Sequence, residues 1–369
     1  MKILYFIPGI NTAGAEKQLL MLSENMIKRK YEIIVVTMMP QFELKPHFES
    51  LGISVTSLGM KSPSLRFKYI IRFSNMIKFT KPSIIHSHMM SANIFARITK
   101  IVNFGTFPKL ICTSHNLIET KNKVVEFVFK ITDSVSDFNS IISKSAAKRY
   151  TDNRLSKDIN VIYNGVSLEK HSKNVNKRIP QKIKNWSKKD FNWISVGRLE
   201  PQKGYLYLIE AFRLLLEKYT YNTKLVIAGD GSQRKTLENM IRNYGISENV
   251  VLMGKCNDIP GLMSCADAFI LSSVYEGFGM VITEAMASSL PVIVTDSGGP
   301  LEIVGSDGSC GFVVEPGNAR QLFHAMVKMY NLSKIERSAM GNKGRQRVGT
   351  LFDMEKISLK WNEIYRSFI

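Results

Sequence analysis

The stretch that decides the fold is AFILSSVYEGFGMVITEAMAS, residues 268–288. Its first six residues suit a buried strand and its last seven suit a helix. The loop between them carries Gly277 and Gly279, which let a ligand approach the backbone closely. A glycine loop that opens into a helix predicts an anion site, because free N–H groups and the positive end of the helix dipole converge there. Glu276 in the loop and Glu284 one turn into the helix could both face that site.

An anion site beside two carboxylates suits a ligand that carries both phosphates and sugar hydroxyls. The alternative interpretation of the same residues is a tight turn followed by solvated helix glutamates. The remaining motifs of the chain must decide between the two.

The size and composition of the chain describe a folded two-domain protein. With 369 residues, 44% of them hydrophobic and 22% charged, we expect two domains of about 150–200 residues. No run approaches the ~18 apolar residues of a spanning helix, and MKILYFIPG at the N-terminus predicts a buried strand instead of a signal peptide. The cysteines lack metal or redox spacing, so we expect reduced thiols in a cytosolic protein. They are Cys112, Cys256, Cys265 and Cys310.

The charge of the chain is strongly positive and uneven. The net charge is +19, and residues 1–170 contribute +12 of it through 24 Lys and Arg against 12 Asp and Glu. A basic domain predicts an anionic partner: nucleic acid, a membrane surface or a phosphorylated substrate. No zinc-finger or RNA-recognition signature is present, so we expect no nucleic-acid partner.

Apolar, β-branched runs alternate with helix-period segments along the whole chain, which predicts parallel sheets covered by helices on both faces. The strand candidates of the first half are Lys2–Ile7, Glu32–Thr37, Ser54–Leu58, Ser83–His86, Lys109–Thr113, Ser140–Ser143 and Asn160–Tyr163. Those of the second half are Asn192–Val196, Lys224–Ala228, Val250–Met253, Ala268–Leu271, Pro291–Thr295 and Gly311–Val314. The fold class is therefore α/β, with two Rossmann-like doubly wound domains.

We expect an N-terminal domain at 1–170 and a C-terminal domain at 190–353. A polar, Lys- and Asn-rich linker containing Pro180 joins them at 171–189. The final helix-like segment, 354–369, would pack back toward the first domain. Ligands of doubly wound sheets bind beyond the carboxyl ends of the strands, so a cleft between the two domains would hold both substrates.

The stretch VGRLEPQKG, residues 196–204, follows the first strand of the second half. Arg198 and Lys203 in this loop could hold a diphosphate, Arg as a bidentate fork and Lys as a point charge. Such a pair would also stabilise the charge that a nucleoside diphosphate gains as it leaves. In isolation, two loop cations are as easily explained as solvated surface residues.

Other motifs at expected strand ends are less specific. AGDG at 228–231 lacks the third glycine of a dinucleotide-binding loop, because Arg234 stands in its place, and a tight turn explains it better. Gly14 opens a helix after the first strand, where backbone N–H groups could meet a phosphate. The motifs HSH at 86–88 and SHN at 114–116 also follow strands, and His115 is equally compatible with a structural and a functional role.

Taken in order, these motifs resemble those of glycosyltransferase family 4. The matching motifs are AGAE (13–16), HSH, SHN, YNGV (163–166), VGRL with Lys203, AGDG, EGFG with Glu284, and GGPLE (298–302). The resemblance spans residues 1 to about 320 and implies retaining, nucleotide-sugar-dependent enzymes of GT-B fold. It departs in the first loop, where Ala13 stands at a position that is often glycine.

The resemblance also implies a role for each candidate site residue. Arg198 and Lys203 would hold the donor diphosphate and Glu284 the ribose. Glu276 and the backbone of Gly277, Phe278 and Gly279 would hold the donor sugar. His115 would lie near the donor sugar and the leaving phosphate, and Gly14 near a phosphate.

Further implications concern partners and location. The donor would be a UDP- or GDP-sugar, and the acceptor a polyprenyl-diphosphate-linked saccharide in bacterial surface polysaccharide (O-antigen or capsule) synthesis. No Asp-x-Asp motif is present, so we expect neither a metal nor another cofactor. Basic-aromatic segments at 65–73 and 121–130 suggest an anionic membrane surface as partner. The enzyme would then be cytoplasmic and peripheral at the inner face of the plasma membrane.

Three alternatives remain open from the sequence. A nucleotide-sugar epimerase of GT-B fold would share the architecture but would not use a lipid-linked acceptor. An NAD-dependent oxidoreductase is disfavoured by the incomplete glycine motif. An inactive carbohydrate-binding subunit is disfavoured because Arg198, Lys203, Glu276 and Glu284 are all present.

Overall fold

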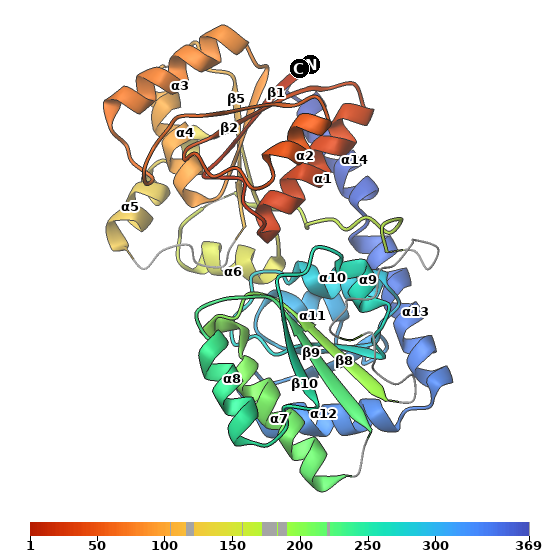
Figure 1. The fold of residues 1–369 in the computed structure, drawn as a ribbon. Coiled ribbons are helices and arrows are strands. Elements are labelled where there is room, and N and C mark those ends of the chain that lie inside the picture. Colours follow the sequence, from red (N-terminus) through yellow and green to blue (C-terminus); the bar gives the residue numbers. More distant parts are fainter. Residues whose placement is uncertain are drawn as a thin grey trace. The chain divides into compact units, whose positions relative to one another are not determined.

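The computed structural model describes residues 1–103, 105–115, 122–156, 158–171, 183, 190–219 and 222–368. The chain divides into two compact units (Figure 1). The first comprises Met1–Gly165 and Met354–Ile369, and the second comprises Val166–Asp353. The linker expected at 171–189 lies outside the described residues except for positions 171 and 183.

The first unit is built on a seven-stranded parallel sheet of order β3-β2-β1-β4-β5-β6-β7. Its strands are β1 Lys2–Ile7, β2 Glu32–Thr37, β3 Ser54–Ser57, β4 Ile84–His88, β5 Lys109–Ser114, β6 Phe138–Ile141 and β7 Asn160–Val161. The chain builds the sheet outward from β1 to β3 and then returns to place β4 on the other side of β1. The order of the strands therefore reverses between β1 and β4.

Helices cover both faces of this sheet, as its apolar strands require. They are α1 Gly14–Lys28, α2 Lys45–Ser50, α3 Phe67–Thr80, α4 Met90–Val102, α5 Lys123–Ile131, α6 Lys144–Asp152 and α14 Met354–Arg366, with a 3-10 turn η1 at Asp133–Val135. In Figure 1, α3 and α4 lie on one side of the sheet, and α1, α2 and α14 lie on the other. The two apolar cores alternate along β1, where Ile3 and Tyr5 face the α1 side and Leu4 and Phe6 the α3 side.

Helix α14 is an integral part of the first unit although it is last in the sequence. The Tyr365 hydroxyl lies 2.7 Å from His86 Nδ1, and the Trp361 ring lies 4.5 Å from the His86 ring. Met354, Ile357 and Trp361 all enter the core on that face.

The second unit is built on a six-stranded parallel sheet of order β10-β9-β8-β11-β12-β13. Its strands are β8 Phe191–Val196, β9 Thr223–Ala228, β10 Val250–Gly254, β11 Ala268–Leu271, β12 Val292–Thr295 and β13 Gly311–Val314. Here the order of the strands reverses between β8 and β11.

The helices of the second unit form two groups. They are α7 Tyr205–Lys218, α8 Arg234–Asn243, α9 Ile259–Met263, α10 Met280–Ala287, α11 Gly299–Val304, α12 Ala319–Asn331 and α13 Lys334–Leu351, with a 3-10 turn η3 at Pro201–Lys203. Residues of α7, α8 and α12 form one core with β8, β9 and β11. A second group, α10, α11 and α13, packs against β11, β12 and β13.

The expected α/β class with two doubly wound sheets is confirmed, and the strand bounds differ from expectation by few residues. The largest shift concerns the strand expected at Ser140–Ser143, which runs from Phe138 to Ile141. Ser143 instead begins helix α6, where its hydroxyl accepts a hydrogen bond from the Ala146 backbone N–H (3.2 Å). The backbone of Ser143 is still extended (φ −155°, ψ 154°), as is typical of an N-cap residue, and the helix begins directly after it.

Candidate functional site

Both sheets reverse their strand order at a point where polar loops emerge. Ligands of open parallel sheets bind beyond the carboxyl ends of the strands at this point, because the two neighbouring loops turn to opposite faces and leave a crevice. In the second unit, the loops after β8 and β11 flank the reversal and carry Lys203 and Glu276. In the first unit, the loop after β1 leads to Gly14, and β4 ends at His88.

Lys203 and Glu276 form an ion pair between Nζ and Oε2, and both side chains are mostly buried. Ser273 Oγ donates a second hydrogen bond to the same Glu276 oxygen (3.3 Å). Each side chain is thus held in place by a partner from the other loop. A partly buried ion pair loses much of its hydration, so it contributes little to the stability of the fold. The contact nevertheless joins the loop after β8 to the loop after β11.

The close approach of these two loops depends on Gly204. Its φ of +64° is left-handed, and a Cβ atom there would lie 2.1 Å from the Ser272 carbonyl oxygen. Ser272 Oγ in turn donates to the Lys203 carbonyl (3.0 Å). The backbone carrying Lys203 therefore rests directly on the end of β11, and only glycine permits this contact.

The glutamate loop is held by its neighbour after β12. Glu276 N donates to the Ser297 carbonyl (3.1 Å), and Gly299 N donates to the Glu276 carbonyl (3.3 Å). Gly279, with φ +95°, begins helix α10. The Phe278 side chain is buried and packs on Phe352, with ring centroids 5.6 Å apart. The Phe278 side chain therefore belongs to the core and does not reach a ligand.

Arg198 and Glu284 occupy more open positions. Arg198 is exposed in the loop after β8, and Glu284 lies partly buried in the second turn of α10. Glu200, in the same loop as Arg198, accepts hydrogen bonds from the Ser232 hydroxyl (2.7 Å) and backbone N–H (3.1 Å). These bonds lower the pKa of Glu200, and the positive charge of Arg198 acts in the same direction. The Arg198 loop is thereby tied to the loop after β9.

In the first unit, Gly14 is exposed as the first residue of α1. The preceding Ala13 has an extended backbone (φ −104°, ψ 179°) and provides no side-chain cap. The fifteen-residue helix therefore begins without a capping side chain at the loop after β1. Backbone N–H groups in such a first turn can bind an anion.

His115 follows β5 and pairs with a histidine that the sequence did not single out. His115 Nε2 lies 3.0 Å from His88 Nδ1, and both rings are buried. Burial lowers the pKa of His115 to about 4, and it lowers the pKa of His88 as well. Both imidazoles are therefore neutral at pH 7, one donating and the other accepting the shared proton.

Two further observations mark His88. Its Nε2 is buried and has no hydrogen-bond partner among the residues that the structure describes. The next residue, Met89, has φ +75° and ψ 149° at the start of α4, a conformation that residues other than glycine rarely adopt. The chain holds this junction against local strain, as is common at functional sites.

His86 has a structural role. Its Nδ1 contacts Tyr365, and its Nε2 lies 2.7 Å from Thr113 Oγ1. Because residues i and i+2 of a strand share a face, the HSH motif places His86 and His88 on the same face of β4. The rings of His86 and His88 accordingly lie 4.1 Å apart.

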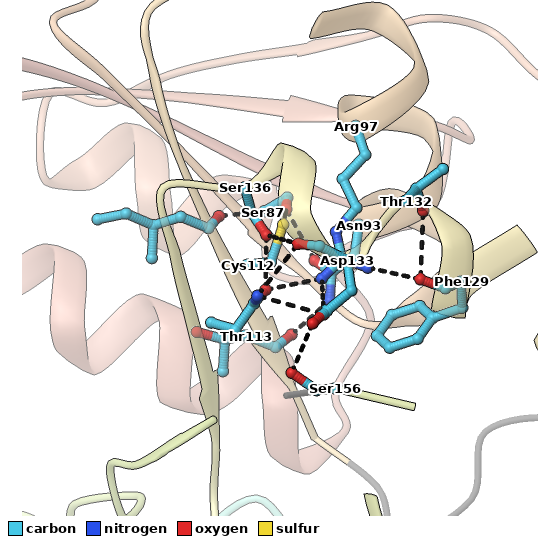
Figure 2. A network of polar contacts seen from close by, with 12 residues as sticks. Ser87, Asn93, Arg97, Cys112, Thr113, Phe129, Thr132, Asp133, Ser136 and Ser156 are labelled. Atoms are coloured by element: carbon cyan, nitrogen blue, oxygen red, sulfur yellow. Dashed lines mark hydrogen bonds and ion pairs between the residues drawn. The ribbon is translucent and has the colours of Figure 1, made fainter. Parts of the chain in front are cut away.

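A buried polar network supports the ends of β4 and β5 (Figure 2). Asn93 accepts from Ser87 Oγ (2.7 Å) and donates to the Thr113 carbonyl (3.1 Å), joining both strands to α4. One turn further along α4, Arg97 donates to Asp133 (3.1 Å) and to Asn139 (2.7 Å). The network therefore fixes the strand ends that carry the histidine pair.

Among the residues that the structure describes, no three His, Cys, Asp or Glu side chains lie close enough together to hold a metal ion. No described helix is both long and apolar enough to cross a bilayer.

Comparison with known families agrees with this geometry. Residues 12–170 match the family described as Glycosyltransferase Family 4, and residues 176–347 match Glycosyl transferases group 1. The two matches together account for nearly the whole chain. The chain belongs to glycosyltransferase family 4.

Individual relatives of this glycosyltransferase are moderately similar. An Escherichia coli UDP-Gal:alpha-D-GlcNAc-diphosphoundecaprenol alpha-1,3-galactosyltransferase is 29% identical over 81% of the chain and 79% of its own length. The Campylobacter jejuni N-acetylgalactosamine-N,N'-diacetylbacillosaminyl-diphospho-undecaprenol 4-alpha-N-acetylgalactosaminyltransferase is 28% identical over 97% of both chains. The crystal structure of Anabaena HepE in complex with UDP-glucose superimposes with a TM-score of 0.82 over all of both chains at 20% identity. The glycosyltransferase therefore has the GT-B fold.

Proposed function

We propose that this glycosyltransferase transfers a sugar from a UDP- or GDP-sugar to a polyprenyl-diphosphate-linked saccharide, with retention of configuration at the anomeric carbon. The product would be an intermediate of bacterial surface polysaccharide synthesis, such as O-antigen or capsule. The observation that carries the donor side of this proposal is the pair Lys203 and Glu276 at the strand-order reversal of the second unit.

In this proposal, each second-unit residue contacts one part of the donor. Lys203 and the exposed Arg198 bind the diphosphate, the Glu276 loop binds the sugar, and Glu284 binds the ribose. Binding exchanges partners, because Lys203 moves from the Glu276 carboxylate to a phosphate while Glu276 accepts from sugar hydroxyls. A cation already held at the crevice needs little reorganisation to stabilise the charge of the leaving group.

The chemical step is a front-face displacement. The bond between the anomeric carbon and the β-phosphate oxygen breaks, and the bond to the acceptor oxygen forms on the same face of the sugar. The acceptor hydroxyl proton passes to the departing diphosphate. The protein provides positioning and electrostatic stabilisation, with Arg198 and Lys203 in place of a metal ion.

His115 would act in its neutral form in this step. Because burial holds its pKa near 4, the imidazole adds no positive charge at pH 7 and can hydrogen-bond the donor sugar or leaving phosphate. Gly14 would offer a backbone N–H to a phosphate at the start of α1.

The acceptor side of the proposal rests on the relatives. The names of both the E. coli and the C. jejuni enzymes include a diphosphoundecaprenol-linked substrate. A chain that acts on such a lipid carrier must work at a membrane surface. We therefore place this enzyme at the inner face of the plasma membrane as a peripheral protein.

The proposal is tested with a panel of UDP- and GDP-sugars and undecaprenyl-diphosphate-linked saccharides. One donor is expected to release its nucleoside diphosphate in step with product formation, and NMR of the product should show the anomeric configuration of the donor. Activity should persist in excess EDTA. An inverted product, a donor isomerised without transfer, or activity that EDTA abolishes and Mg²⁺ restores would each contradict the corresponding part of the proposal.

A further inference from the structure

One stretch of the first unit combines positive charge with exposed apolar side chains. Residues 50–118 contain nine Lys and Arg and not one Asp or Glu. Three of these cations, Arg97, Lys100 and Lys109, are neutralised by Asp133 or Asp137. The other six are exposed and form no ion pair with any residue that the structure describes. They are Lys61, Arg66, Lys68, Arg72, Lys78 and Lys81.

The six cations lie on α3 and the segments flanking it, beside large apolar side chains. Phe79 is 89% exposed and Phe67 64% exposed, and Ile71 and Leu65 are also open to solvent. Within the described chain, nine of the fifteen exposed large hydrophobic residues lie between Leu65 and Ile131. Leaving such apolar surface in water is unfavourable, so this concentration indicates a surface that is covered in the cell.

The helical period places these residues together. Phe67 and Ile71 are four residues apart, as are Lys68 and Arg72, so both pairs fall on the outer side of α3. Ile70, Phe73 and Ile77 occupy the inner side and enter the core. We define the α3 face as Phe67, Lys68, Ile71, Arg72, Lys78 and Phe79. It mixes rings and cations where an ordinary solvated helix face carries charges of both signs.

The apolar surface continues onto the neighbouring helices. Asn103, the C-cap of α4, donates to Ser74 Oγ on α3 (2.8 Å), and Arg97 on α4 donates to the Phe129 carbonyl on α5 (3.1 Å). Helix α5 exposes Val124 and Phe127, at 69% and 61%. Figure 1 shows α3, α4 and α5 on the side of the sheet away from α1 and α14.

A groove beside α3 has the same mixed chemistry. It has a volume of about 720 Å³, and its lining includes apolar Ile71, Met76 and Phe79 together with cationic Lys68 and Arg72. A phospholipid presents the matching combination of an anionic headgroup and an acyl chain. A nucleic acid would neutralise the cations but leave the aliphatic side chains in water.

We propose that the α3 face is the surface by which this enzyme docks on an anionic lipid bilayer, with its cations on lipid phosphates and Phe67 and Phe79 inserted among the headgroups. This assignment rests on the proposed lipid-linked acceptor and specifies where the enzyme meets the membrane. Exposed cations on a helix act together on an anionic surface, and each contributes about fivefold to the partition coefficient. The attachment is therefore reversible and sensitive to salt.

The test is co-sedimentation of the full chain with vesicles of phosphatidylglycerol and phosphatidylcholine, compared with phosphatidylcholine alone. Wild type is expected to bind the anionic vesicles and to dissociate as salt rises to about 0.5 M. The triple variant Lys68→Gln/Arg72→Gln/Lys78→Gln should bind about a hundredfold more weakly. The double variant Phe67→Ser/Phe79→Ser should also weaken binding, and that loss should persist at high salt because it removes apolar contacts.

Matched controls come from the second unit. Lys328→Gln/Lys334→Gln/Lys343→Gln removes the same charge from exposed positions, and Ile335→Ser removes an 83% exposed side chain. Both controls should bind vesicles as wild type does. All variants should retain the melting temperature and the calorimetric nucleotide affinity of wild type, since the changed residues are exposed and lie outside the donor loops.

Equal binding of wild type and the α3 triple variant, or equal binding to neutral and anionic vesicles, would overturn the assignment. Binding of an RNA oligonucleotide without binding of anionic vesicles would assign the face to nucleic acid instead. Failure of the proposed function gives a different result, in which α3-dependent vesicle binding persists and no lipid-linked acceptor receives sugar.

Discussion

Lys203 and Glu276, 73 residues apart in the chain, form an ion pair at the reversal point of the second sheet, and the Ser273 hydroxyl holds the same carboxylate. Two residues with separate expected roles are thus partners in the structure. The pairing keeps a cation and a carboxylate in the crevice without leaving either charge unneutralised. Removing either side chain would therefore leave the other without its ion-pair partner.

Removing either cation of the diphosphate site should slow transfer. We expect Arg198→Ala and Lys203→Ala each to lower kcat by a factor on the order of 10², because each removes a charge that stabilises the leaving group. Lys235→Ala, at an exposed position of α8, is the matched control and should leave kcat unchanged. Steady-state kinetics with a saturating donor measures the effect. Near-wild-type turnover of Lys203→Ala would show that Lys203 does not stabilise the leaving group.

The two glutamates should separate binding from transfer. Glu284→Ala is expected to weaken the affinity for the sugar nucleotide and the free nucleoside diphosphate alike, since a ribose contact exists in both ligands. Glu276→Ala should lower kcat far more than nucleotide affinity, because it loses a sugar contact. Calorimetry measures the affinity of both variants for both ligands. If Glu276→Ala lost nucleotide affinity and Glu284→Ala retained it, the two assigned roles would have to be exchanged.

Gly204→Ala should damage the site through the backbone. The added methyl group meets the Ser272 carbonyl at 2.1 Å and imposes a left-handed conformation on alanine, so we expect lower stability and displacement of Lys203. Gly245→Ala is a close control, because its φ of +67° is similar and nothing lies within 4 Å of the new atom. Denaturant unfolding should show a larger loss for Gly204→Ala, and equal losses would mean that the loop adjusts freely.

The buried histidines should make the first unit sensitive to acid. Burial lowers the pKa of His115 to about 4, below its ordinary value of 6.5, so the unfolded chain takes up a proton between these values that the folded chain refuses. Stability should therefore fall as the pH decreases from 6.5 toward 4, by up to about 3 kcal/mol from this one residue.

The measurement is the free energy of unfolding as a function of pH. His115→Asn should flatten the curve in this window, whereas His47→Asn, at an exposed position of α2, should leave it unchanged. An unaltered pH dependence in His115→Asn would show that His115 is not held neutral by the fold.

The sequence by itself determined the two parallel sheets and the loops that carry the candidate site. Strands such as β1 and β11 are short apolar runs buried on both faces, and this pattern is local, so it could be read from residues close together in the chain. The glycines at 277 and 279 likewise indicate a turn, and this signal is local because glycine permits backbone conformations that other residues rarely adopt.

Only the tertiary structure decided which loops meet. The strand order β9-β8-β11 brings Lys203 to Glu276, and the order β1-β4-β5 brings His88 to His115, although 73 and 27 residues separate the partners. Neither pairing is visible in the sequence, because it depends on which strand the chain places on the other side of β8 or β1. The same holds for α3. Its aromatic and cationic residues could be assigned to the outer face only after the structure had shown that Ile70, Phe73 and Ile77 are buried in the core.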